Sequence, residues 1–170
     1  MANQLILCME TNKKSATDDV YILELIRHIY QLNNQTKISR IYMGTKTKYK
    51  AKNVLQEIKA KTKTYISGET RVIYCIDTDD HEKNAEHKRE LIEINRFCQQ
   101  NGYDLVWFCH DVEDVFLGER IADSRKVSEA GAFKRKGLIK EIPLDRLSGS
   151  VEIVHTSNIL NILDKYLSRK

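Results

Sequence analysis

The chain has 170 residues, 41% hydrophobic and 31% charged, with a single proline and seven glycines. This composition excludes a disordered or collagen-like chain, and the length suits one domain that buries a core without disulfides. The net charge of +4 is too small to identify a partner. No apolar run has the length of a membrane-spanning helix, and the one near the N-terminus is too short for a signal peptide.

The four cysteines give no sign of a metal site or of a disulfide framework. They are Cys8, Cys75, Cys98 and Cys109, none of them in a CxxC pair, and most lie inside apolar runs. Cysteine in such a setting behaves as a small hydrophobic residue. We therefore expect a reducing, cytoplasmic compartment and no contact with a membrane.

Four short apolar runs predict buried strands, at residues 5–9, 38–43, 72–76 and 105–109. Helical spacing of apolar residues predicts a helix over residues 17–32, for which Ser15 and Asp18 have the spacing of a capping box. A second helix is expected around residues 54–58. A third is expected to start at Asp80 or just after it and to end at Asn101-Gly102.

The last third of the chain has a less regular pattern. We expect one helix from about Asp111 into the region of Arg120, and another over residues 157–167 capped by Ser157 or Thr156. Strands that alternate with helices predict right-handed βαβ units. The expected fold is a single Rossmann-like α/β domain over residues 1–170, with a parallel central sheet flanked by helices. Its core would span about residues 5–117 and a helical extension about residues 118–170.

Acidic residues follow three of the predicted strands. Glu10 ends the first, Asp77 and Asp79 end the third, and His110-Asp111 with Glu113 follow the fourth. Ligands of open parallel sheets bind outside the carboxyl ends of the strands, so these side chains should converge. Carboxylates repel one another unless a cation neutralises them, and oxygen ligands suit Mg²⁺ or Mn²⁺.

Each acidic residue also has a purely structural interpretation. Asp79 or Asp80 would cap the following helix, and Glu113 would be stabilised by the dipole of a helix in whose first turn it lies.

The metal interpretation depends on the alternation of side chains along a strand. Residues that are two positions apart in a strand point the same way, so the Asp77/Asp79 pair would face one ion. His110 is a candidate proton carrier beside them.

The glutamate after the first strand and the Asp-x-Asp after the third resemble the Toprim domain of topoisomerases, primases and several nucleases. Within that group the chain looks most like the small RloB-like proteins of bacterial phage defence. Residues 104–117, DLVWFCHDVEDVFL, are similar to their motif after the strand, and residues 156–163 are similar in character to their C-terminal end. The resemblance covers residues 5–117 well and the remainder loosely.

The resemblance implies a metal-dependent nuclease, a hydrolase that acts on phosphodiester bonds with Mg²⁺ or Mn²⁺. It places the catalytic roles on Glu10, Asp77 and Asp79, and the metal on these three and Glu113. Such systems sometimes pair the Toprim protein with an ATPase. This chain has no GxxxxGK[ST] phosphate loop of its own, which is compatible with such a partner.

Basic residues supply a candidate surface for a nucleic-acid backbone, either DNA or RNA. They are Lys13, Lys14, Lys46, Lys48, Lys50 and Lys52. The family commonly has glycine after the glutamate, whereas this chain has Thr11. That difference motivates an alternative, a catalytically silent α/β module that binds nucleic acid or a partner protein. A receiver-like signalling domain is the weakest alternative. Such a domain would need a lysine on a later strand near the acidic residues, and the fourth predicted strand has none.

Overall fold

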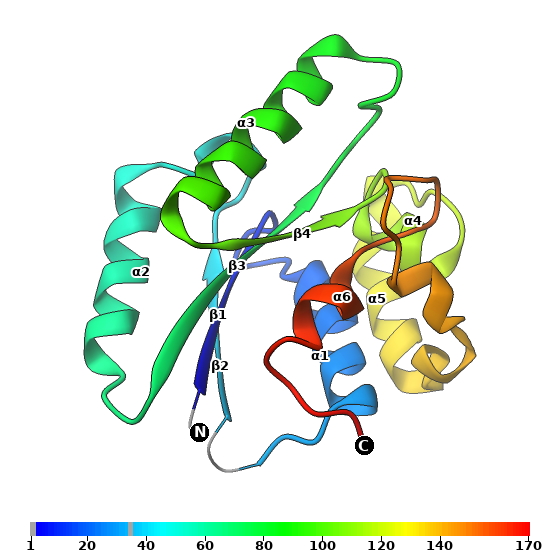
Figure 1. Cartoon of the computed structure of the whole chain (residues 1–170). Coiled ribbons are helices and arrows are strands. Elements are labelled where there is room, and N and C mark those ends of the chain that lie inside the picture. Colours follow the sequence, from blue (N-terminus) through cyan, green and yellow to red (C-terminus); the bar gives the residue numbers. More distant parts are fainter. Residues whose placement is uncertain (1–2, 34–35) are drawn as a thin grey trace.

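A computed structural model describes residues 3–33 and 36–170 of the chain, and it shows an α/β domain with an all-parallel sheet (Figure 1). The strand order is β2-β1-β3-β4. The strands are β1 (Asn3–Met9), β2 (Thr36–Tyr42), β3 (Glu69–Asp77) and β4 (Asp104–Phe108). This confirms the predicted fold class and the four predicted strands.

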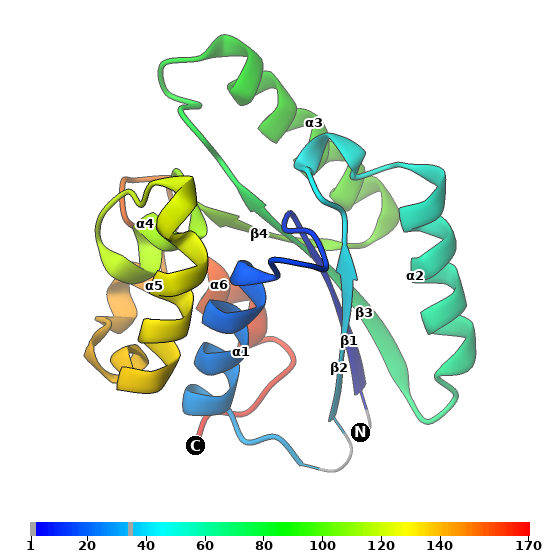
Figure 2. The ribbon, with the colours of Figure 1, turned by 180° about the vertical axis from the view of Figure 1, so that it is seen from behind.

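Within the described residues, six α-helices and three short 3-10 helices connect or follow these strands. The α-helices are α1 (Thr17–Ile29), α2 (Lys52–Thr64), α3 (Ala85–Asn101), α4 (Val112–Leu117), α5 (Asp123–Lys136) and α6 (Ile159–Leu163). The 3-10 helices are η1 (Lys46–Lys48), η2 (Leu138–Glu141) and η3 (Leu144–Leu147). Helices α1, α4, α5 and α6 lie on one side of the sheet and α2 and α3 on the other, as Figures 1 and 2 show.

Side chains of β1 point alternately into two hydrophobic cores, one on each face of the sheet. Leu5, Leu7 and Met9 pack toward α1, α4, α5 and α6, whereas Ile6 and Cys8 pack toward α2 and α3. All of these side chains are at most 1% exposed, which explains why β1 reads as a continuous apolar run. The four cysteines are buried and unpaired.

Several helix boundaries differ from the sequence-based prediction. Ala16, in a left-handed conformation, precedes α1, and no side chain caps this helix, so the Ser15/Asp18 capping box is wrong. Helix α3 begins at Ala85 because Asn84, and neither Asp79 nor Asp80, accepts hydrogen bonds from its first turn. Its end at Gly102 is as predicted.

The C-terminal region differs more. Helix α4 stops at Gly118, before Arg120. Helix α6 covers only Ile159–Leu163 of the predicted residues 157–167, and Asn158 stands at its N-cap position. Ser157 Oγ accepts a hydrogen bond of 3.2 Å from the N–H of Ile159, whereas the predicted Thr156 cap is wrong. Helix α5 was not predicted, because only two of its side chains, Ala130 and Phe133, are buried and the apolar spacing is correspondingly faint.

Candidate functional site

The carboxyl edge of the sheet contains a topological switch point between β1 and β3. From β1 the chain passes over one face through α1 to β2, then over the other face through α2 to β3 on the far side of β1. Such a reversal leaves a crevice in which open α/β sheets bind ligands. Glu10 follows β1 and Asp77 ends β3, and Oε2 of Glu10 accepts a 2.7 Å hydrogen bond from the backbone N–H of Asp77. These two predicted residues therefore meet across the crevice.

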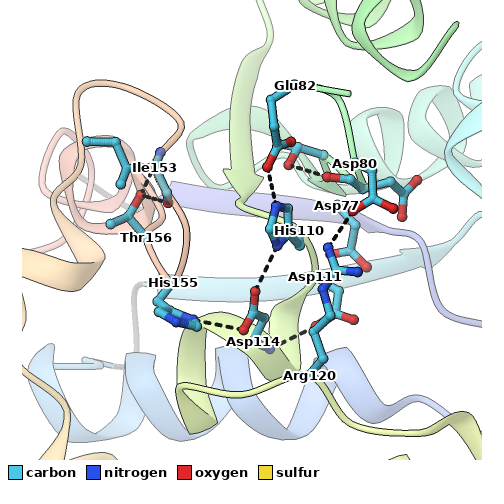
Figure 3. A network of polar contacts seen from close by, with 12 residues as sticks. Asp77, Asp80, Glu82, His110, Asp111, Asp114, Arg120, Ile153, His155 and Thr156 are labelled. Carbon is cyan, nitrogen blue, oxygen red and sulfur yellow. Dashed lines mark hydrogen bonds and ion pairs between the residues drawn. The ribbon is translucent and has the colours of Figure 1, made fainter. Parts of the chain in front are cut away.

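The Asp77 carboxyl group points to the side of the sheet that carries α1 and α4. Its Oδ1 accepts a hydrogen bond of 3.1 Å from the N–H of Val112, the first residue of α4. Burial raises the pKa of Asp77 well above its usual range, and the carboxylates of Glu10, Asp18, Asp111 and Glu113 raise it further. Asp77 is thus one member of a larger group of acids, and Figure 3 shows it beside Asp111.

Helix starts supply the other acids of this group. Asp18 lies in the first turn of α1, Asp111 precedes α4 and accepts from the N–H of Asp114, and Glu113 lies in the first turn of α4. Both Asp18 and Glu113 are buried. Here "acidic cluster" means Glu10, Asp18, Asp77, Asp111 and Glu113.

Carboxyl groups of the acidic cluster hold their protons to higher pH than in the unfolded chain. Burial, followed by the charges of Glu113 and Glu10, raises the pKa of Asp18 to about 7. Burial also raises the pKa of Glu10, against the opposing effects of the Asp77 N–H and Lys46. Burial likewise raises the pKa of Glu113, although Lys126 opposes the shift. The cluster carries more acid than its surroundings can keep fully ionised.

One lysine partly compensates the cluster. Lys126, on α5, lies 3.1 Å from Oε2 of Glu113 and 3.5 Å from Oδ2 of Asp111. The other oxygen of Glu113, Oε1, is buried and has no hydrogen-bond partner. A buried carboxylate oxygen without a donor is costly, so this atom is available to a cation.

The carboxylate of Asp79 is held by Lys46, although its charge reaches the acidic cluster and raises the pKa of Glu10. Strand β3 ends at Asp77, and Asp79 has a left-handed backbone with φ of 51°. The alternation that would point both aspartates the same way therefore does not extend to Asp79, whose carboxylate pairs with Lys46.

Lys46 differs from the other lysines that the sequence suggested for nucleic-acid binding. It is only 5% exposed, and its ammonium group also donates to the carbonyl of Asp77 at 3.0 Å. The remaining five are exposed, in the loop after β1 and in the connection after β2: Lys13, Lys14, Lys48, Lys50 and Lys52. Lys46 is thus an internal counter-ion in this structure, and the exposed lysines flank the same edge of the sheet.

The donor chemistry of the acidic cluster fits a hard divalent cation, because all its ligating atoms are carboxylate oxygens. In residues 3–33 and 36–170, however, no three His, Cys, Asp or Glu side chains already have the arrangement of a metal site. The carboxylate oxygens best placed to bind a cation are Oε1 of Glu113, Oε1 of Glu10 and Oδ2 of Asp77. The other oxygens of Glu10 and Asp77 accept backbone hydrogen bonds, and Oε1 of Glu113 has no hydrogen-bond partner. Side-chain rotation would be needed to bring them onto one ion.

Sequence reasoning found Glu10, Asp77 and Glu113 but missed Asp18 and Lys126. Asp18 had a usable signal, since the helix after β1 must begin at the carboxyl edge of the sheet and Asp18 lies in its first turn. Lys126 had none, because α5 has a faint pattern and its docking depends on tertiary packing against α1.

Comparison with protein-family models, with curated proteins and with solved structures found no match. In the described parts of the chain, none of the helices combines the length and the apolar character that crossing a membrane requires.

Proposed function

We propose that the chain is a metal-dependent phosphodiesterase that cleaves nucleic acid at the crevice between β1 and β3. One observation carries this proposal. Buried or partly buried carboxyl groups from β1, α1, β3 and α4 gather at the topological switch point, with raised pKa values and too few positive partners. Such a concentration of acid is a common feature of sites that bind a divalent cation.

Glu10, Asp77 and Glu113 are the residues that would hold the cation. A bound Mg²⁺ or Mn²⁺ supplies charge stabilisation at a phosphoryl oxygen and lowers the pKa of a coordinated water. Asp79, predicted as a further ligand, would have to exchange its ion pair with Lys46 for the metal. As an alternative to holding the cation, Glu10 would handle protons, because burial raises its pKa and its carboxyl group keeps a proton to higher pH than an exposed glutamate does.

Exposed lysines on the β1 and β2 side of the crevice would hold the backbone of the substrate. Lys13 and Lys14 follow β1, and Lys48, Lys50 and Lys52 follow its neighbour β2, so both groups lie at the carboxyl edge. Lysine contacts to phosphates carry no sequence information, so they fit either DNA or RNA. The resemblance to RloB-like Toprim proteins supports the same reaction and a role in phage defence, with an ATPase as a possible partner protein.

A cleavage assay tests this proposal. Labelled single-stranded and double-stranded DNA and RNA are incubated with the protein in Mg²⁺, in Mn²⁺ or in EDTA. We expect cleavage only with metal, and a loss of at least about 100-fold in Asp77→Asn, the size typical of a lost catalytic group. Asp145→Asn is the matched control, because Asp145 is exposed and lies in η3, outside the acidic cluster. Metal-dependent cleavage at the wild-type rate by pure Asp77→Asn protein would refute the assignment.

A second candidate function is a catalytically silent module that binds nucleic acid. The ion pairs of two buried or half-buried lysines, Lys46 and Lys126, favour it. Lys46 and Lys126 already pair with Asp79 and Glu113, as structural counter-ions would. Under this alternative no substrate is cut under any condition, and Asp77→Asn binds nucleic acid as the wild type does. Charge reversal at Lys48, Lys50 and Lys52 would abolish that binding under both alternatives.

A further inference from the structure

A second polar site lies beside the acidic cluster, at the outer end of β4. It is an open cavity of about 490 Å³ between the loop after β3, the start of α4 and the loop before α6. Of the residues that line it, Figure 3 labels Asp80, His110, Asp114, Arg120 and His155. The nitrogen-bearing side chains that line it are Lys83, Asn84, His110, Arg120 and His155.

A buried carboxylate organises the two histidines of this cavity. The side chain of Asp114 is 1% exposed, and each of its oxygens has one imidazole partner. Nδ1 of His110 lies 3.1 Å from Oδ2, and Nδ1 of His155 lies 2.8 Å from Oδ1. A carboxylate only accepts, so both Nδ1 atoms donate and both rings are fixed in orientation.

The remaining nitrogen of His110 also contacts a carboxylate. Its Nε2 lies 2.5 Å from Oε1 of Glu82, a side chain that is 40% exposed. This hydrogen bond is the main reason why the pKa of Glu82 is lowered. The His110 ring therefore lies between two carboxylates, with Nδ1 at the buried Asp114 and Nε2 at the exposed Glu82.

Arg120 is a cationic donor in the same cavity. Its Nη2 donates to Oδ1 of Asp80 at 2.5 Å, and the Asp80 side chain is 47% exposed. Lys83 also lines the cavity and makes no ion pair within the described ranges. Asp80 and Glu82 both belong to the loop after β3, so one exposed loop supplies the oxyanions that His110 and Arg120 bind.

The backbone conformation of the two histidines is independent evidence for function. His110 and His155 have φ values of 46° and 66°, in the left-handed region that side-chain-bearing residues seldom adopt. Residues held in such conformations gather at functional sites. The same conformation at Asp79, which bridges to His110, extends this feature toward β3.

We propose that this cavity binds a phosphate monoester, whose oxygens replace the carboxylates of Glu82 and Asp80 on His110 and Arg120. A monoester dianion presents three terminal oxygens, and the cavity offers donors from three sides through Lys83, His110 and Arg120. The volume exceeds that of a phosphate alone, so the esterified group has room to extend outward.

The phosphate site adjoins the acidic cluster. A smaller cavity of about 160 Å³ shares His110 and Arg120 with it and reaches Asp79 and Asp111. A nucleic-acid end with a terminal phosphate is one source of the ligand, and a free mononucleotide is the other. Binding at this site requires no metal and stands independently of the cleavage proposed above.

Calorimetric titration with inorganic phosphate, in EDTA and at constant ionic strength, tests the site. We expect saturable binding to the wild type and a loss of at least about tenfold in Arg120→Gln and in His110→Gln. Arg89→Gln is the matched control, because Arg89 is exposed on α3 outside the cavity. Glu82→Gln is expected to bind phosphate more tightly, since it removes a competing carboxylate, and no merely structural role predicts this gain.

Absence of binding to the wild type, or equal binding by wild type and Arg120→Gln, overturns the proposal. If Arg120→Gln does not fold, the titration is repeated with Arg120→Lys, which keeps the positive charge but lacks the guanidinium group. Adenosine monophosphate and a 5′-phosphorylated oligonucleotide then distinguish the two sources. Each is compared with its form that lacks the phosphate, and equal affinity for both forms overturns the assignment as well.

Discussion

At the scale of single residues, the raised pKa of Asp18 makes the stability of the fold depend on pH, and this dependence can be measured. Its pKa is raised from about 3.8 to about 7, mainly by burial and then by Glu113 and Glu10. The folded chain therefore retains a proton between these values that the unfolded chain has lost. Stability should fall as the pH rises through this range, with the full penalty present above pH 7.

Removing the charge of Asp18 should remove its share of this penalty. We expect Asp18→Asn to raise the free energy of unfolding above neutral pH by about 1–2 kcal/mol and to leave it nearly unchanged at acid pH. Urea unfolding in EDTA at several pH values measures both. Asp145→Asn, at an exposed position, should reproduce the wild-type profile. A parallel shift of Asp18→Asn at every pH would contradict the electrostatic explanation.

At the scale of elements, the side chain of Asn158 hydrogen-bonds the exposed backbone edge of β4, where a further strand would otherwise pair. Its Oδ1 accepts from the N–H of Trp107 at 2.9 Å, and its Nδ2 donates to the carbonyl of Leu105 at 2.9 Å. Asn158→Ala should destabilise the protein by about 1–3 kcal/mol, because it leaves two backbone groups of β4 without partners. Thermal unfolding measures this loss. Asn53→Ala, at an exposed position of α2, should change stability by less than about 0.5 kcal/mol.

The elements that the sequence predicted well are those whose burial follows from local periodicity. Strand β1 is buried on both faces and reads as unbroken apolar residues. Helix α3 has Leu91, Ile94 and Cys98 on one face, so its existence was clear, but its start was not. Several polar residues between Asp79 and Asn84 can cap a helix, and only the turn after β3 selects Asn84.

The candidate site was predictable in part for a similar reason. Glu10 and Asp77 follow strands, and parallel strands bring their carboxyl ends to one edge. The pairing of Asp79 with Lys46 was not predictable, because it depends on a left-handed residue and on a buried lysine in an otherwise exposed tract.

At the scale of the whole molecule, exposed lysines surround the crevice on the side of β1 and β2. We expect triple charge reversal at Lys48, Lys50 and Lys52 to abolish nucleic-acid binding, since about three phosphate contacts are lost. The wild-type affinity should fall steeply with salt concentration. Fluorescence anisotropy with labelled DNA and RNA at several salt concentrations measures both effects.

A matched control separates location from net charge. Lys134, Arg135 and Lys136 are exposed at the C-terminal end of α5. Their reversal changes the net charge equally, outside the lysines that flank the crevice, so it should leave most of the binding intact. Equal losses in the two triple variants would mean that binding depends on net charge alone.

The acidic cluster is tested most directly by calorimetric titration with Mn²⁺ at about pH 7.5, in two buffers that differ in ionisation enthalpy. The proposed site predicts saturable binding to the wild type and to Asp145→Asn, with loss of binding in Asp77→Asn. Because the pKa values of Glu10 and Asp77 are raised, binding should also release protons, so the measured heat should depend on the buffer. No binding to the wild type, or identical isotherms for the wild type and Asp77→Asn, would contradict the proposed metal site.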